Sequence, residues 1–299
     1  MSVMAGPEWT VWPAPAKLNL FLRILGRRAD DYHVLQTVFQ LIDWLDEVHL
    51  RTRDDGQIVR VAGPAAVPAA DDLSVRAAHA LAEASGCALG VDIALTKRIP
   101  MGGGFGGGSS DAATVLVALN HLWRTGLSLD TLAEIGLRLG ADVPVFVRGD
   151  NAWAEGIGEL LRPITLSPAW YVIIAPGVHI ATSALFSDPE LTRAAEPATI
   201  AQFVAGEIRD NAFEPLLRRR DAVIEQALVA LSRVGSARVT GTGAGCFAAY
   251  DSREAACAAC SALPEALQAR VVRGLSHSPL HDCLRAVSGN DAPASPVSR

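Results

Sequence analysis

The chain has 299 residues, half of them hydrophobic, and carries a formal net charge of −6. This length is enough for one large or two ordinary domains. The negative charge argues against nucleic acid as a partner, and no apolar run approaches the ~20 residues that a membrane span requires. The N-terminal segment lacks the charged and apolar regions of an export signal, and five scattered cysteines suit a reducing cytosol. We therefore expect a cytoplasmic protein that binds neither nucleic acid nor membrane.

The first predicted element is a strand over residues 16–25, where polar and apolar residues alternate. The alternation places Lys17 and Asn19 on one face. That face is either the solvated side of an edge strand or the wall of a cleft. Lys17 and Lys97 are the only lysines among 26 basic residues. Their presence is either due to chance or reflects a need for a compact point charge at these two positions.

Further strands are predicted over residues 36–50 and 57–61, joined by a hairpin turn with the sequence RTRDDG. Apolar spacing then predicts a helix over residues 73–85, and VDIALT at residues 91–96 is typical of a strand.

The next stretch, residues 100–120, contains six glycines followed by two serines and an alanine-rich run. Glycine permits positive φ angles and a close approach of backbone N–H groups. Ser109 or Ser110 can cap the helix that we expect to continue through Asn120, with Asp111 in its first turn. A glycine loop that leads into a helix N-terminus favours an anion, and we expect a nucleotide polyphosphate.

Three other interpretations of the glycine loop fit less well. A flexible linker would not be bracketed by a strand and a capped helix. The glycines satisfy the G-x-G-x-x-G dinucleotide pattern, but no second strand with an acid at its end follows at the required distance. A Walker loop requires lysine where Ser109 stands.

A helix is predicted over residues 130–139, with Gly140 as its C-terminal cap. Asp142 follows in an apolar setting, where its carboxylate needs hydrogen bonds or a cation. It is either a turn residue that caps backbone N–H groups or the base of a phosphoryl-transfer site.

In the second half, WYVIIAPG predicts a buried strand, residues 221–234 a helix, and ARVTGTGAGCFAAY two strands around a glycine turn. A helix over residues 255–263 ends at Pro264, and ARVVRGL predicts a last strand. Cys257 and Cys260 form a lone CxxC, which we interpret as helix packing rather than a metal or redox site. Residues 288–299 are predicted to be a disordered tail.

The segment PMGGGFGGGSSDAA resembles the phosphate loop of the GHMP small-molecule kinases, with Phe105 in place of the usual leucine. Three more segments resemble motifs of that family: APAKLNLFLRILGRRADDYHVLQTVFQLID, GADVPVF with the later GIGE, and ARVTGTGAGCFAAY. Within the family, the first of these is similar to kinases that phosphorylate a cytidine diphosphate ester of methylerythritol, in the non-mevalonate route to isoprenoids.

The resemblance implies an α+β, two-domain GHMP kinase fold. Residues 1–163 would form an ATP-binding domain similar to domain 2 of ribosomal protein S5, and residues 164–287 a ferredoxin-like α/β sandwich. The implied reaction is transfer of the γ-phosphate of ATP to the 2-hydroxyl of the methylerythritol unit, with Mg²⁺ neutralising phosphate charge. We expect a monomer or weak homodimer with a small-molecule substrate.

The resemblance also implies roles for individual residues. Lys17 and Asp142 would be catalytic, and Tyr32 would stack on the cytosine opposite Phe186, which can also be an ordinary packing residue. The ATP-binding residues would be Lys97, Pro100, Gly102, Gly103, Gly104, Gly106, Gly107, Gly108, Ser109 and Ser110. The substrate-binding residues would be Asn19, Tyr32, His33, Thr182, Phe186, Gly241, Thr242 and Gly243.

Two departures from the family pattern accompany these matches. Asp31 stands where the family usually has glycine, and Asp72 where it has an asparagine that contacts adenine. The metal ligands are not identified, although the hydroxyl of Ser109 or Ser110 is a candidate. The alternatives are a GHMP kinase for another alcohol, such as homoserine or mevalonate, and a nucleotide-binding protein without turnover.

Overall fold

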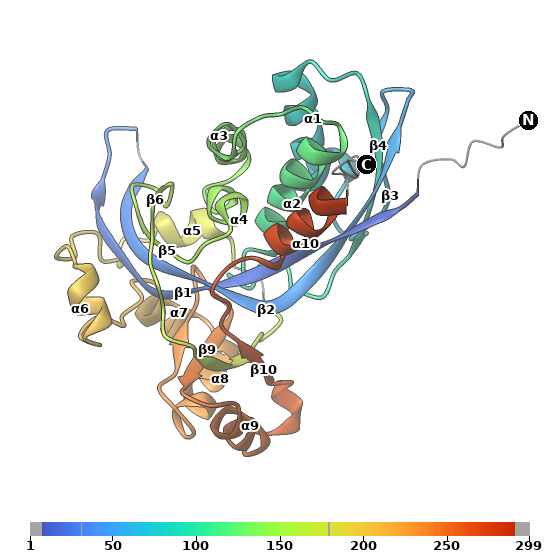
Figure 1. Ribbon diagram of the computed structural model, residues 1–299. Helices are drawn as coiled ribbons and strands as arrows, with labels where there is room; N and C mark the ends of the chain where they lie inside the picture. The colour runs from blue at the N-terminus through green and yellow to red at the C-terminus, as the bar shows by residue number, and fades with distance from the viewer. Residues whose placement is uncertain (1–7, 31, 179, 291–299) are drawn as a thin grey trace, which may run out of the picture.

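Figure 1 shows the computed structural model, which describes residues 8–30, 32–178 and 180–290. Within these residues the chain forms a six-stranded and a four-stranded sheet. In the larger sheet the strand order is β3–β4–β2–β5–β6, and β1 also pairs with β2. Its strands are β1 (Thr10–Arg27), β2 (His33–Arg53), β3 (Ile58–Ala62), β4 (Gly90–Thr96), β5 (Ala152–Glu155) and β6 (Leu160–Pro163).

Four helices of the first half pack against the larger sheet, because their apolar faces join those of β1, β2 and β4 in one core. These helices are α1 (Leu73–Ser85), α2 (Gly107–Leu122), α3 (Leu129–Leu139) and α4 (Val143–Arg148). A 3₁₀ turn at Ala69–Asp71 precedes α1. The central helix α2 is buried along most of its length, as its run of alanine, valine and leucine predicts.

The smaller sheet has the order β10–β7–β9–β8, and helices α8 and α9 pack on it. Its strands are β7 (Trp170–Ile174), β8 (Arg238–Val239), β9 (Cys246–Tyr250) and β10 (Arg270–Arg273). The helices of this half are α5 (Thr182–Phe186), α6 (Ile200–Val204), α7 (Glu214–Arg220), α8 (Ala222–Ser232), α9 (Arg253–Ser261) and α10 (Pro279–Asn290), with a 3₁₀ turn at Glu265–Leu267.

The two halves are joined by packing as well as by the chain. A third apolar cluster brings Leu18 and Trp44 of the larger sheet together with Tyr171 and Phe247 of the smaller one. The last helix, α10, returns to the first half, lies beside α2 and buries Leu280 in the first core. The domain limits at residues 163 and 287 stay a prediction. No helix in the described part of the chain is long and apolar enough to cross a membrane.

The predicted hairpin at residues 51–56 is wrong. Strand β2 continues to Arg53, and β3 pairs in parallel with β4 rather than with β2. The reason is burial: Val91 and Ile93 of β4 are fully buried, which suits a central position, whereas β3 is half-exposed along its length and occupies the sheet edge.

Two predicted helix boundaries also need correction. Helix α2 starts at Gly107 after Gly106, so neither Ser109 nor Ser110 is its cap, and Asp111 lies beyond its first turn. Helix α10 continues through Asn290, so residues 288–290 are helical rather than part of a tail. The remainder of the predicted tail, residues 291–299, lies outside the described residues.

Candidate active site

A cavity of about 490 Å³ lies where the glycine loop, β1 and the turn at residues 240–245 meet. It is lined by every residue predicted for the site except Ser110, Tyr32 and His33. The predicted residues on its wall are Lys17, Asn19, Lys97, Pro100, Gly102, Gly103, Gly104, Gly106, Gly107, Gly108, Ser109, Asp142, Thr182, Phe186, Gly241, Thr242 and Gly243. Residues from both halves of the chain therefore contribute to one cavity.

The glycine loop needs its glycines because other backbone approaches it closely. Gly104 has a φ of +75°, and a Cβ there would lie 2.3 Å from the carbonyl oxygen of Thr240. The N–H of Gly245 donates to the Gly103 carbonyl at 2.9 Å, which ties this loop to the second glycine turn. Because no side chain caps α2, the N–H groups of its first turn remain available to an anion at the positive end of the helix dipole.

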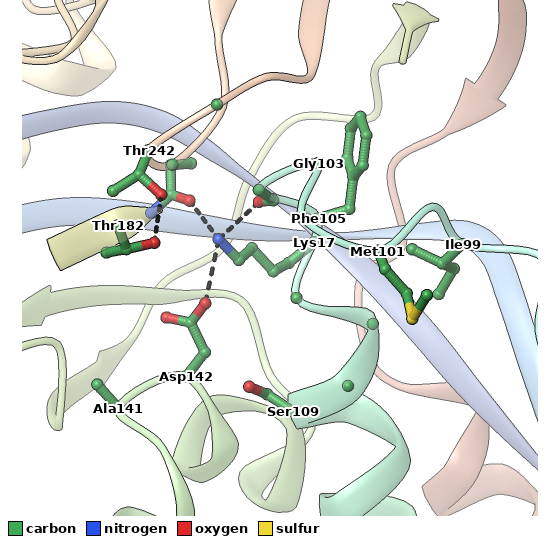
Figure 2. Close-up of a pocket in the computed structure, with 18 of the residues that line it drawn as sticks. Lys17, Ile99, Met101, Gly103, Phe105, Ser109, Ala141, Asp142, Thr182 and Thr242 are labelled. Atoms are coloured by element: carbon green, nitrogen blue, oxygen red, sulfur yellow. Dashed lines mark hydrogen bonds and ion pairs between the residues drawn. The ribbon is translucent and has the colours of Figure 1, made fainter. Parts of the chain in front are cut away.

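Lys17 is held at the centre of the cavity by three acceptors. Its Nζ donates to Asn19 Oδ1 and to the Gly104 carbonyl at 2.9 Å, and lies 3.2 Å from Asp142 Oδ2 (Figure 2). The Asn19 amide is itself oriented by donation from Nδ2 to Thr37 Oγ1 at 2.9 Å. The Lys17 side chain is only 3% exposed, so its ammonium group is fixed rather than mobile.

Asp142 lies between α3 and α4, facing Lys17. Its side chain makes no cap hydrogen bond to α4, so the interpretation as a turn residue that caps backbone N–H groups is wrong. The side chain is 34% exposed and lines the cavity, which leaves the carboxylate open to a bound hydroxyl group. An accessible carboxylate can take a proton from a bound hydroxyl group, and a buried cation beside it can stabilise developing negative charge.

Lys97 also lines the cavity, but its ammonium group is already engaged. It lies between the carboxylates of Asp46 and Asp111. Burial lowers the pKa of Lys97, and the two carboxylates outweigh this effect, so the net pKa is raised. The other oxygen of Asp46 accepts the N–H groups of Arg98 and Ile99, the latter at 2.8 Å, and so fixes the entry to the glycine loop.

Comparison with known proteins identifies the family. Residues 72–150 match the family model "GHMP kinases N terminal domain", and residues 196–269 match "GHMP kinases C terminal". A 4-diphosphocytidyl-2-C-methyl-D-erythritol kinase of Xanthomonas campestris pv. campestris (strain B100) is 61% identical over 95% of this chain and 96% of its own. The chain belongs to the 4-diphosphocytidyl-2-C-methyl-D-erythritol kinases, a family of GHMP kinases.

Other comparisons agree with this kinase family. The relative of the same name from Xylella fastidiosa (strain 9a5c) is 58% identical over 94% of this chain and 95% of its own. A crystal structure of 4-(cytidine 5'-diphospho)-2C-methyl-D-erythritol kinase has a TM-score of 0.75 at 33% identity, covering 89% of this chain and 98% of that one. A homoserine kinase from Cytophaga hutchinsonii, with a TM-score of 0.66 at 17% identity over 93% and 97%, shares the fold. The predicted α+β GHMP kinase fold is thus confirmed.

The far end of the cavity in this kinase is built by α5 and the second glycine turn. Thr182 Oγ1 and Thr242 Oγ1 lie 3.2 Å apart, joining these two segments (Figure 2). Phe186 lines the cavity, stacks on His33 at 4.9 Å between ring centroids, and meets Phe213 edge-on at 5.0 Å. Its two proposed roles, packing and lining a binding site, are therefore compatible.

Three residues predicted for the site lie off the cavity wall. Tyr32 is 59% exposed, and its predicted stacking on cytosine stays a prediction, whereas His33 stacks directly on Phe186. His33 is buried behind Phe186 and accepts a hydrogen bond from Arg193 Nε at 3.1 Å. Ser110 is buried inside α2, where its hydroxyl has no partner, so of the two serines Ser109 is the one that can reach a ligand.

Asp72, which replaces the family's asparagine, has a structural role. Its carboxylate caps α1 by accepting the Ser74 N–H at 2.9 Å and pairs with Arg60 at 2.6 Å. Asp72 is 6% exposed and is not among the residues that line the cavity, although its neighbour Leu73 is. Asp31 lies outside the described residues.

Proposed function

We propose that this kinase transfers the γ-phosphate of ATP to the 2-hydroxyl of 4-diphosphocytidyl-2-C-methyl-D-erythritol, which gives the 2-phosphate and ADP. The reaction belongs to the non-mevalonate route to isoprenoid precursors. The observation that carries this proposal is the 3.2 Å contact between Lys17 Nζ and Asp142 Oδ2, inside a cavity of about 490 Å³ that the glycine loop lines. A cavity of this size is within the range of small-molecule sites.

We assign the ATP phosphates to the glycine loop and the start of α2. The six glycines bring bare backbone to the cavity wall, and the uncapped N–H groups of α2 point their partial positive charge at an anion. Lys97 contributes to this site by holding the loop entry through Asp46, rather than by binding a phosphate with its own ammonium group.

In this proposal Asp142 accepts a hydrogen bond from the 2-hydroxyl and takes its proton as the oxygen bonds to the γ-phosphorus. The bond between that phosphorus and the bridging oxygen of ADP breaks in the same displacement. Lys17 keeps Asp142 ionised and, from its fixed position beside the loop carbonyl of Gly104, stabilises negative charge on the transferred group.

Mg²⁺ would neutralise the charge of the phosphates. Among the described residues, no three His, Cys, Asp or Glu side chains gather to hold a metal ion. A magnesium ion bound to a nucleotide needs only one or two protein oxygen ligands, since phosphate oxygens and water complete its shell. Ser109 fits this need, because its residue lines the cavity at the start of α2, and Ser110 does not.

We assign the cytidine end of the substrate to the part of the cavity near Phe186 and Thr182. An aromatic ring there offers a face for stacking on a base, and the hydroxyls of Thr182 and Thr242 offer hydrogen bonds to polar groups. The roles predicted for Tyr32 and His33 on the base are kept as proposals, with His33 acting through Phe186.

The experiment that tests the function is an ADP-release assay with ATP and Mg²⁺. It compares the cytidine diphosphate ester with mevalonate and homoserine, the substrates of the alternative kinases. We expect turnover with the cytidine ester alone. Turnover with mevalonate or homoserine instead would assign another alcohol, and ATP binding without turnover on any of them would support the binding-protein alternative.

We also propose a cytoplasmic location and a monomer or weak homodimer with no nucleic-acid partner. The support is compositional: a net charge of −6 and scattered cysteines. Sedimentation of the purified protein over a range of concentrations tests the oligomeric state.

A further inference from the structure

A second cavity, of about 210 Å³, lies on the other face of β1. Lys17, Asn19 and Leu22 line the active site, whereas Leu20 lines this second cavity. Ordinary alternation along β1 turns Leu20 away from the face of Lys17 and Asn19, and a register shift in the β1–β2 pairing between Asn19 and Leu22 returns Leu22 to the active-site face. Among the described residues, the two cavities share no lining residue.

The wall of the second cavity carries two arginines, Arg209 and Arg238. Arg209 Nη1 donates to the carbonyls of Phe203 and Ile208 at 2.7 and 2.6 Å, and Arg238 Nη1 donates to the Leu20 carbonyl at 2.8 Å. In the described part of the chain, neither guanidinium group forms an ion pair with a carboxylate. Each guanidinium group also stacks on an aromatic ring, Arg209 on Phe203 and Arg238 on Phe247. Carbonyls and ring faces therefore contact both charges, but no carboxylate among the described residues pairs with them.

The electrostatic environment of Arg238 agrees with this reading. Burial and the neighbouring charge of Arg209 lower the pKa of Arg238 to about 10, against a weaker opposite effect of Tyr171 and Glu214. Glu214 is already committed, since its carboxylate pairs with Arg218 and accepts the Val239 N–H. Arg209 and Arg238 thus place two positive charges on the cavity wall, which makes the cavity electropositive although the net charge of the chain is negative.

Several polar groups on the wall can donate to a ligand. Arg238 Nε is buried without a hydrogen-bond partner, and a buried polar atom in that state calls for an ion or a water molecule. Tyr171 lines the cavity and is 2% exposed, and the hydroxyl residues Thr165 and Ser167 line it as well. These lining residues come from β7, from β8, from the segment before β7 and, with Arg209, from the segment between α6 and α7.

We propose that this cavity is a second anion site, in which Arg209 and Arg238 bind a small phosphate-class anion such as diphosphate. Guanidinium groups match the oxygen pairs of a phosphate and are the side chains best suited to bind it. At about 210 Å³ the cavity is below the ~300–1,000 Å³ of sites for drug-sized ligands, so it fits a phosphate or diphosphate group and not a second nucleotide.

The test is a calorimetric titration with inorganic pyrophosphate at constant ionic strength. The protein is first saturated with a non-hydrolysable ATP analogue and with cytidine 5'-diphosphate, so that the glycine loop and the cytidine end of the active site are both occupied and only a site outside this cavity can respond. The variants are Arg209→Gln, Tyr171→Phe and, as a control, Arg233→Gln, which removes the same charge from an exposed arginine of the same half of the chain.

We expect one equivalent of pyrophosphate to bind the wild type. Arg209→Gln should weaken binding about tenfold or more, because it removes a positive charge that faces the anion, and Tyr171→Phe about threefold, because it removes one hydroxyl donor. Arg233→Gln should bind as the wild type does. Binding that is absent when the ATP analogue is present, or unchanged in Arg209→Gln, or equally weakened in Arg233→Gln, overturns the proposal. If Arg209→Gln does not fold, unchanged binding in Tyr171→Phe overturns it instead.

Discussion

The Asp142→Asn variant separates catalysis from stability. Asparagine keeps the size of the side chain and one oxygen for Lys17, but it carries no charge and cannot take a proton. Lys17 Nζ retains Asn19 Oδ1 and the Gly104 carbonyl, and Asp142 is 34% exposed, so the loss of unfolding free energy should be about 1 kcal/mol or less. Loss of a general base lowers a rate by about 10²–10⁴, or roughly 3–5 kcal/mol of transition-state free energy. The kinetic effect should therefore exceed the effect on stability.

The assay measures kcat and KM for both substrates by ADP release, together with thermal unfolding and calorimetric ATP binding. We expect kcat to fall at least a hundredfold, while ATP affinity stays within about threefold of the wild type. Asp130→Asn is the matched control, because Asp130 also pairs with a basic residue, Arg148 at 3.0 Å, but is 76% exposed on the surface. A kcat for Asp142→Asn within tenfold of the control would remove Asp142 from the mechanism.

Three further predictions follow from the geometry. Gly104→Ala should lower the unfolding free energy by at least about 1 kcal/mol more than Gly126→Ala and should raise KM for ATP. Both glycines have a φ near +70°, but a Cβ on Gly104 would lie 2.3 Å from the carbonyl oxygen of Thr240, whereas a Cβ on Gly126 would meet nothing within 4 Å. Equal melting temperatures of the two variants would contradict this. Phe186→Ala should raise KM for the cytidine ester roughly tenfold and leave KM for ATP unchanged, and a parallel rise in both would argue against a cytidine contact. Burial raises the pKa of Asp111 from 3.8 to about 7, so the folded chain keeps a proton that the unfolded chain releases above about pH 4. The contribution of Asp111 to the unfolding free energy should fall by at most about 4 kcal/mol between about pH 4 and 7. Urea unfolding over this pH range should show the decline in the wild type and not in the Asp111→Asn variant.

Local patterns predicted those parts of the fold that depend on neighbours in sequence. The alternation of β1 placed Lys17 and Asn19 on one face, and both line the cavity. The glycine loop was predicted between a strand and a helix, and it lies between β4 and α2. Ser109 or Ser110 was expected to cap α2 because serine is a strong N-cap residue. Glycine is also found at N-cap positions, and Gly106 takes this one, where Phe146 and Lys17 approach too closely for a side chain.

Long-range pairing could not be predicted in this way. Strand β4 lies between β2 and β3 because both of its faces are buried. The turn-like sequence of residues 51–56, which leads from β2 to β3, does not indicate that another strand separates them. The catalytic roles of Lys17 and Asp142 were inferred from family resemblance, and their 3.2 Å contact could not be derived from local patterns, because nothing in either pattern relates β1 to the segment before α4. Asp46, in β2, was overlooked for the same reason: its partners Lys97, Arg98 and Ile99 lie in the segment that follows β4.

The surroundings of Lys17 and Lys97 show why these two positions near the glycine loop carry lysine and not arginine. An ammonium group has three donors that diverge from one point. Lys17 uses them on Asn19, Gly104 and Asp142, and Lys97 bridges two carboxylates. A guanidinium fork is longer and planar, and the Lys17 side chain has no spare room, because a Cβ on Gly106 would already lie 3.1 Å from its Cε. At Lys17, converging acceptors and the nearby Gly106 therefore favour a single nitrogen over a guanidinium group, and at Lys97 two carboxylates contact one ammonium group.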